Sequence, residues 1–290
     1  MTQTPPLIYV STCAFENREL SALLATCQTH GIDAIELSAL EGYSLELLEQ
    51  ARQWASLLVH NYFPPPAASF LLNIASQNPI ALRRTIEFCK AAIDLAERLD
   101  SPVYGIHGGF AVDIPTHLLG RPVEQAKLLE SGLPDREVLY ATILDSVREL
   151  NDYASPRGVK LLVENNVISS RSGNEARRLL PMAEAADLTR LVRDVGDPNF
   201  GLLLDVGHAK VSSVACGFDL ETFVAEVAPH VRALHLSDND GLEDRNAPFG
   251  KDAWFIPHLR HFAASAVTLE LSRIAPYRIV EVRDLVREAL

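Results

Sequence analysis

Acidic and imidazole side chains recur where short apolar runs of this sequence end. The run Gly201-Leu202-Leu203-Leu204-Asp205-Val206-Gly207-His208 has the pattern of a buried parallel strand that leads into an acid, a glycine and a histidine. We expect Gly207 to let the chain turn at the end of this strand. By itself the stretch is also explained by a core strand whose Asp caps the next helix, so the argument depends on the whole set.

Other apolar runs end in the same way. The residues at these ends are His60, His107, Glu164, Asp205 with His208, His235 and Glu270, and Glu36 lies near the end of another run. Histidine supplies only 9 of 290 residues, so chance does not explain this accumulation. A purely structural polar network would be costly, because buried charges need a partner or a cation. Glutamate, aspartate and histidine together suit Mn²⁺, Mg²⁺, Co²⁺ or Zn²⁺, and additional imidazoles favour zinc at a second site.

The elements that carry these residues alternate between strand and helix. Apolar runs predict eight strands, at residues 7–10, 32–37, 56–61, 103–107, 159–164, 202–205, 231–236 and 266–271. Helical patterns separate nearly all of them, and residues 110–133 form a long loop of the kind that often acts as a lid. This order predicts an α/β fold, a single (β/α)8 barrel in one domain over residues 1–290, with its active site at the carboxyl ends of the strands.

Composition limits the partners of the protein. The net charge of −12 disfavours a nucleic-acid-binding surface and fits a small polar ligand bound through a cation. No apolar run is long enough to span a bilayer and the first residues lack a signal-peptide pattern, so we expect a cytoplasmic protein without membrane contact. The four cysteines have no CxxC spacing and are expected to be reduced. The sequence leaves a homo-oligomer open.

Several motifs resemble the xylose-isomerase-like barrel superfamily, which contains sugar isomerases and epimerases and also the endonuclease IV enzymes. The motifs are Ile35-Glu36-Leu37, Val163-Glu164-Asn165, Leu204-Asp205-Val206-Gly207-His208, His235-Leu236-Ser237-Asp238 and Leu269-Glu270-Leu271. In the epimerase branch the resemblance implies that one divalent ion is bound by Glu164, Asp205, His235 and Glu270. It places His208 on the substrate and makes Glu164 and Glu270 the acid/base pair that acts through an enediolate. We expect Glu36 and Asp238 to support the ligands through hydrogen bonds.

The endonuclease IV branch is the alternative reading. Its trinuclear zinc site also uses histidines of the third and fourth strands, and His60 and His107 occupy those positions, where they bind either a second metal or substrate. Asp244-Arg245-Asn246 lies where that branch carries an Asp-x-His pair, and the amide of Asn246 is a poor zinc ligand. We therefore predict a metal-dependent isomerase or epimerase of a sugar or sugar derivative. The alternatives are a zinc phosphodiesterase acting on abasic DNA and a dehydratase or non-catalytic descendant with the same metal site.

Overall fold

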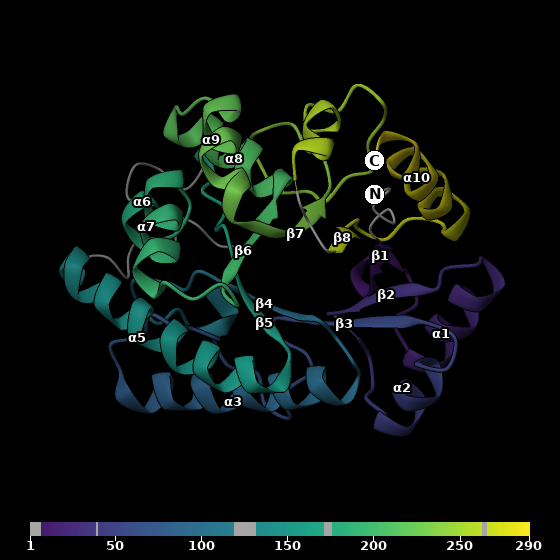
Figure 1. The fold of residues 1–290 in the computed structure, drawn as a ribbon, viewed down its shortest axis with the longest axis horizontal. Helices are drawn as coiled ribbons and strands as arrows, with labels where there is room; N and C mark the ends of the chain where they lie inside the picture. Colours follow the sequence, from purple (N-terminus) through teal and green to yellow (C-terminus); the bar gives the residue numbers. More distant parts are fainter. Residues whose placement is uncertain (1–6, 39, 119–131, 171–175, 263–265) are drawn as a thin grey trace.

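The computed structural model describes residues 7–38, 40–118, 132–170, 176–262 and 266–290. Eight parallel strands form a closed barrel in which each strand pairs with the next and β8 pairs with β1 (Figure 1). The strands are β1 (Leu7–Ser11), β2 (Ala34–Leu37), β3 (Ser56–His60), β4 (Val103–His107), β5 (Lys160–Glu164), β6 (Gly201–Asp205), β7 (Val231–Leu236) and β8 (Ala266–Leu269). The (β/α)8 fold class predicted from the sequence is confirmed.

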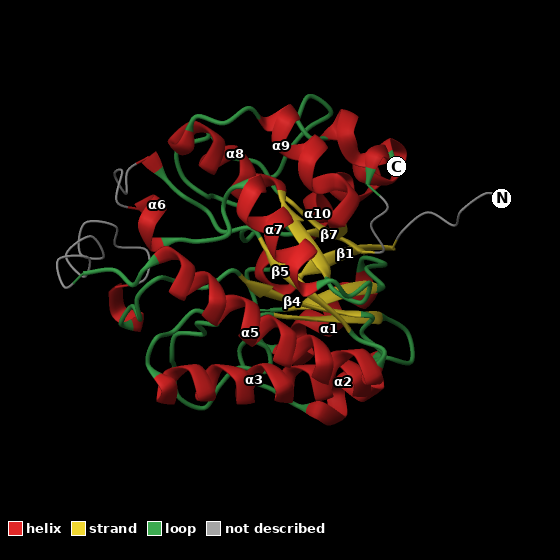
Figure 2. Ribbon diagram, turned by 60° about the vertical axis from the view of Figure 1, so that its left-hand side comes forward, coloured by secondary structure: helices red, strands yellow, loops and turns green. Residues whose placement is uncertain are grey.

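Helices surround the barrel (Figure 2). They are α1 (Leu20–Thr29), α2 (Leu45–Ala51), α3 (Pro79–Arg98), α5 (Arg136–Ala154), α6 (Ala176–Leu179), α7 (Ala185–Val195), α8 (Val206–Cys216), α9 (Leu220–Val227) and α10 (Pro276–Ala289). The start of α3 follows from its sequence, since Asn78 accepts hydrogen bonds from the Ile80 and Ala81 amides and Pro79 occupies the first turn. None of the described helices is long and apolar enough to cross a membrane.

The barrel interior has an apolar layer beneath a polar one. Successive side chains of a strand point to opposite faces, so a residue and the one two places further on share the interior. The apolar layer is a cluster of buried side chains formed by Tyr9, Ala34, Leu58, Val103, Leu162, Leu203, Ala233 and Ala266. Two residues beyond Leu58, Leu162, Leu203 and Ala233 come His60, Glu164, Asp205 and His235. The apolar layer therefore closes the floor of the polar layer.

Two sequence-based expectations need comment. The turn expected at Gly207 is wrong, because α8 begins at Val206, directly after β6. Glycine is needed there for another reason, since a Cβ atom would lie 2.7 Å from Ser237 Oγ and 3.2 Å from Asp205 Oδ1. The lid expected over residues 110–133 falls partly on residues 119–131, which lie outside the described residues.

Candidate metal centre

Four side chains meet where strands β5 to β8 end. Glu164, Asp205 and His235 extend from β5, β6 and β7, and Glu270 directly follows β8. Each offers one ligand atom, and these four atoms lie within 4.8 Å of one another. The Glu164, Asp205 and His235 side chains are at most 1% exposed, whereas that of Glu270 is 17% exposed. Three members of the group are thus buried, and the group reaches solvent through Glu270.

A second group shares Glu164. His60 at the end of β3 and His107 at the end of β4 place their Nε2 atoms 3.5 Å and 3.2 Å from Glu164 Oε2. The ligand atoms of these three residues also lie within 4.8 Å of one another. A side chain at Gly105 would crowd this group, because its Cβ atom would lie 2.9 Å from His60 Nδ1. The structure therefore brings His60 and His107 next to the four-residue group, with one carboxylate common to both.

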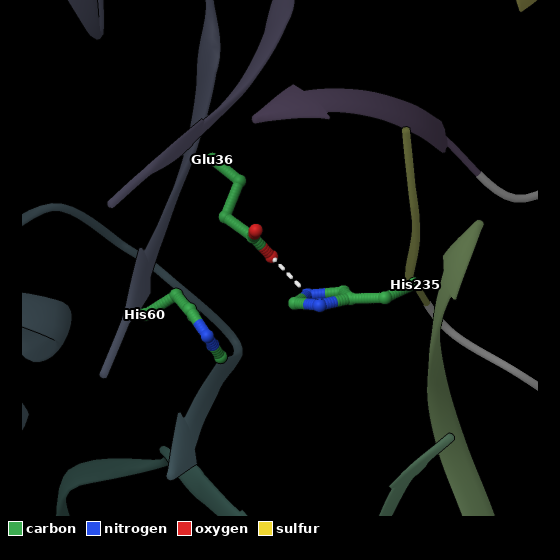
Figure 3. A group of neighbouring side chains, drawn as sticks. All are labelled: Glu36, His60 and His235. Carbon is green, nitrogen blue, oxygen red and sulfur yellow. Dashed lines mark hydrogen bonds and ion pairs between the residues drawn. The ribbon is translucent and has the colours of Figure 1, made fainter. Parts of the chain in front are cut away.

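His235 is held between carboxylates on both edges of its ring. Its Nδ1 atom lies 2.9 Å from Glu270 Oε2 and 3.6 Å from Glu164 Oε1. Its Nε2 atom lies 3.0 Å from Glu36 Oε2, on the opposite side of the ring (Figure 3). The hydroxyl of Thr268 donates to the same Glu36 oxygen at 3.0 Å. Glu36 thus contacts His235 from the side away from Glu164 and Glu270.

Asn165 joins the ends of β5 and β6. Its side-chain oxygen accepts a hydrogen bond from the Asp205 amide at 2.8 Å, and its amide nitrogen donates to the Asp205 carbonyl at 3.0 Å. Asp205 Oδ1 then caps α8 by accepting from the His208 amide at 2.7 Å. Asp205 Oδ2 is buried and has no hydrogen-bond partner in the described structure. Oδ1 of Asp205 therefore caps α8, and Oδ2 remains for the four-residue group.

His208 lies beside the four-residue group. Its Nδ1–H donates to the Asn165 carbonyl at 2.8 Å, which directs Nε2 toward Asp244 Oδ2 at 3.3 Å and Asp205 Oδ2 at 3.9 Å. The side-chain oxygen of Asn246 accepts a hydrogen bond from Ser237 Oγ at 3.3 Å. His208 is thus placed where a bound molecule above Asp205 would meet its Nε2 atom.

The carboxylates of the centre have displaced pKa values. Burial would raise the pKa of Glu164, but His107 and His235 more than offset it and hold that pKa well below its usual range. Burial likewise opposes ionisation of Glu270, yet His235 lowers the pKa of Glu270 to about 2. Burial dominates at Asp205 and raises its pKa well above the usual range. Histidine contacts thus favour the ionised forms of Glu164 and Glu270, whereas burial disfavours the ionised form of Asp205.

The imidazoles respond to the same charges. Burial works against a charged His235, but Glu36, Glu270 and Glu164 raise its pKa well above the usual range. Asp205 and Asp244 raise the pKa of His208 in the same way, again against burial. At His60 burial prevails and lowers the pKa.

Several buried oxygen atoms without hydrogen bonds indicate whether a cation would fit the four-residue group. Both carboxylate oxygens of Glu164 and Oδ2 of Asp205 are buried and have no hydrogen-bond partner among the described residues. Such atoms are costly unless a partner satisfies them, and a divalent ion would do so. Three carboxylates and one imidazole suit Mn²⁺, Mg²⁺, Co²⁺ or Zn²⁺, while the two imidazoles of the neighbouring group favour zinc. The residues present fit a divalent metal.

Other residues singled out in the sequence lie further out. Asp238 pairs with Lys210 at 2.7 Å, and none of its described contacts involves the four-residue group. Sequence reasoning assigned no role to Asn165 or Thr268. Thr268 could have been found from strand periodicity, because it lies two residues before Glu270 and shares its face.

Comparisons with known proteins agree with this architecture. The chain belongs to the xylose isomerase-like TIM barrel family, whose model matches residues 24–288. An uncharacterized protein of Methanocaldococcus jannaschii is 24% identical over 252 residues, which are 83% of this chain and 74% of that protein. The structure is similar to a D-tagatose 3-epimerase-like protein, with a TM-score of 0.71, 21% identity and coverage of 97% and 96% of the two chains. It is also similar to an AP endonuclease of family 2 from Brucella melitensis, with a TM-score of 0.67, 16% identity and coverage of 95% and 96%.

Proposed function

We propose that this protein is a divalent-metal-dependent isomerase or epimerase of a sugar or sugar derivative. The observation that carries the proposal is the pair Glu164 and Glu270, two carboxylates that both approach Nδ1 of His235 within one group of metal-ligand type. Family membership and the likeness to a D-tagatose 3-epimerase-like protein support a polyhydroxylated carbonyl compound as substrate.

The chemistry follows from the residues. A divalent ion held by these four residues would polarise a substrate carbonyl and the hydroxyl beside it, which would acidify the C–H bond of the carbon that carries this hydroxyl. Glu270 or Glu164 removes that proton, giving an enediolate, and a carboxylate returns a proton to the same or the neighbouring carbon. Glu270 is the more accessible of the two, and His208 offers Nε2 to a substrate hydroxyl. The apolar layer below Glu164 keeps bulk water from the reacting carbon on that side.

Proton exchange tests the proposal. Purified protein with Mn²⁺ is incubated in deuterated water with a panel of free and phosphorylated ketoses, and deuterium at the carbon beside the carbonyl is measured by NMR. We expect incorporation with at least one ketose, and its loss when the metal is chelated. Absence of exchange across the panel, with metal bound at full occupancy, would contradict the proposal.

A second function is favoured by one specific observation. His60 and His107 converge on Glu164, so two groups of metal-ligand type share one carboxylate. A pair of metal ions stabilises the attacking and leaving oxygens when a phosphodiester is cleaved. This supports a zinc phosphodiesterase of the AP endonuclease type. The net charge of −12 and the commitment of the Asn246 oxygen to Ser237 weigh against duplex DNA as substrate.

Abasic duplex DNA separates the two functions. We expect no nicking by the zinc-loaded protein and no salt-dependent duplex binding. His107→Ala should reduce the bound metal by about one ion per chain if this group is occupied. Nicking of abasic DNA that disappears in His107→Ala, together with no ketose exchange, would make the phosphodiesterase the function to retain.

A further inference from the structure

Glu36 lies beside His235 of the four-residue group and takes no part in the proposed reaction. It is only 3% exposed, on β2, and its carboxylate points at the ring of His235 (Figure 3). Its Oε2 atom is 3.0 Å from His235 Nε2, while its Oε1 atom is buried and without a hydrogen-bond partner in the described structure. A carboxylate kept in such a place at a desolvation cost calls for a specific role.

The contact determines which nitrogen of His235 can bind a metal. A carboxylate oxygen accepts, so both ring nitrogens of His235 donate in the metal-free site, Nε2 to Glu36 and Nδ1 to Glu270. A cation bound on the Nδ1 side would replace the Nδ1 hydrogen, while Glu36 keeps the hydrogen on Nε2. Nδ1 is the atom that faces Glu270 at 2.9 Å and Glu164 at 3.6 Å. A ring that turned over would place Nε2 toward these carboxylates and lose the hydrogen bond to Glu36.

Thr268 holds Glu36 in turn. Its hydroxyl donates to Glu36 Oε2 at 3.0 Å, and the side chain is almost fully buried. Thr268 and His235 are directly paired across β7 and β8, so the two donors to Glu36 come from neighbouring strands at one level of the barrel. Water has little access to replace either contact.

We propose that Glu36, oriented by Thr268, is a positioning residue that holds His235 with Nδ1 toward the metal group. The inference concerns how the metal is held, and it applies equally to epimerisation and to phosphodiester cleavage. A competing arrangement exists, because Glu36, His60 and His235 themselves form a group with ligand atoms within 4.8 Å. Glu36 Oε2 accepts hydrogen bonds from both Thr268 and His235, and this favours a positioning role for Glu36 over a role as metal ligand.

Metal affinity measured without reference to activity tests the inference. Zn²⁺ and Mn²⁺ binding is measured by competition with a chromophoric chelator for the wild type, Thr268→Val, Thr268→Ser and Glu36→Gln. Removing the support of a metal-bound imidazole costs about 10- to 100-fold in affinity, and we expect that loss in Glu36→Gln and about tenfold in Thr268→Val. Thr268→Ser keeps the hydroxyl and should restore the affinity. Thr222→Val is the matched control, because it removes a hydroxyl that donates to Asp219 on the surface at 2.8 Å.

A spectroscopic readout separates positioning from general destabilisation. In the Zn²⁺-loaded protein, the His235 ring should show a slowly exchanging Nε2–H proton, assigned by its loss in His235→Asn. We expect that proton to exchange rapidly in Glu36→Ala. Wild-type affinity in both Glu36→Gln and Thr268→Val would overturn the inference. Loss of one whole ion per chain in Glu36→Ala would overturn it too, since Glu36 would then be a ligand. If the Glu36 variants do not fold, the Thr268→Val and Thr268→Ser pair decides.

Discussion

Glu270 differs from the other residues of the metal group in its access to solvent. Its side chain is 17% exposed, against at most 1% for Glu164, Asp205 and His235. His235 also lowers its pKa to about 2, so it is a carboxylate at any physiological pH. Among these four residues, Glu270 is therefore the one that a molecule entering from solvent can reach, as an ionised group that can accept a proton.

Replacing Glu270 should separate chemistry from folding. Glu270→Gln keeps the shape but removes the charge and the proton acceptor, so we expect ketose exchange to fall by at least about 100-fold. The unfolding temperature of the metal-free protein should change little. Glu281→Gln, an exposed change beside Arg278, is the control and should leave exchange intact. Normal exchange in Glu270→Gln would mean that this residue is neither base nor required ligand.

The candidate ligands at the strand ends could be predicted from the sequence, whereas the residues that hold them through hydrogen bonds could not. Glu164, Asp205 and His235 each follow an apolar run, which is a local pattern. Asn165 acts by reaching the backbone of Asp205, and that partner follows 40 residues later. Nothing local to Asn165 reveals such a contact, because it depends on how β5 and β6 lie side by side.

Among the elements, the junction of β5, β6 and α8 does the most to shape the site. Asn165 is 1% exposed and bonds both the amide and the carbonyl of Asp205, the residue that also caps α8. The absence of a turn between β6 and α8 puts Asp205 and His208 on one side of the metal group. The sequence pattern suggested a turn at Gly207 because glycine commonly marks one, yet here the lack of a side chain admits Ser237.

Breaking this junction should affect metal binding more than an equivalent change elsewhere. Asn165→Ala leaves the buried amide of Asp205 unpaired, at a cost of about 1–3 kcal/mol, removes one hydrogen bond to the Asp205 carbonyl, and frees Asp205 to move. We expect lower stability and clearly weaker Mn²⁺ binding by calorimetry. Asn199→Ala is the matched control, since Asn199 donates to the Val159 carbonyl at 2.9 Å near the opposite end of these strands. It should lower stability while leaving Mn²⁺ affinity unchanged, and equal affinity losses in both variants would contradict this account.

At the scale of the whole molecule, the two groups that share Glu164 take their side chains from most strands of the barrel. Side chains from the ends of six consecutive strands, β3 to β8, belong to the two groups that share Glu164. The order of strands and helices along the chain was sufficient to predict this barrel, because parallel strands with helical crossovers allow few closed arrangements. The exact ends of the strands were less predictable, since the final ladder bonds depend on neighbouring strands.

The pH dependence of stability should reveal the charged imidazoles. The raised pKa values of His235 and His208 give stability that is fully present below an unfolded-state pKa of about 6.5 and is lost as pH rises through the folded-state values. We expect the unfolding temperature of the chelated protein to fall as the pH rises above about 6.5. Saturating metal takes the place of the His235 proton on the Nδ1 side, so the fall should be smaller in calorimetric scans with Mn²⁺ or Zn²⁺. A chelated protein that gained stability over this range would contradict the assigned charges.

The sharing of Glu164 between two groups also bears on how chemistry can diverge on this barrel. His60 and His107 are the members of the second group that the four-residue group does not use. A lineage could therefore gain or lose the second ion through changes at the ends of β3 and β4 alone, and the ligands on β5 to β8 would remain untouched. Proton transfer beside a carbonyl and cleavage of a phosphodiester need then differ in only a few of the ligands that such a barrel provides.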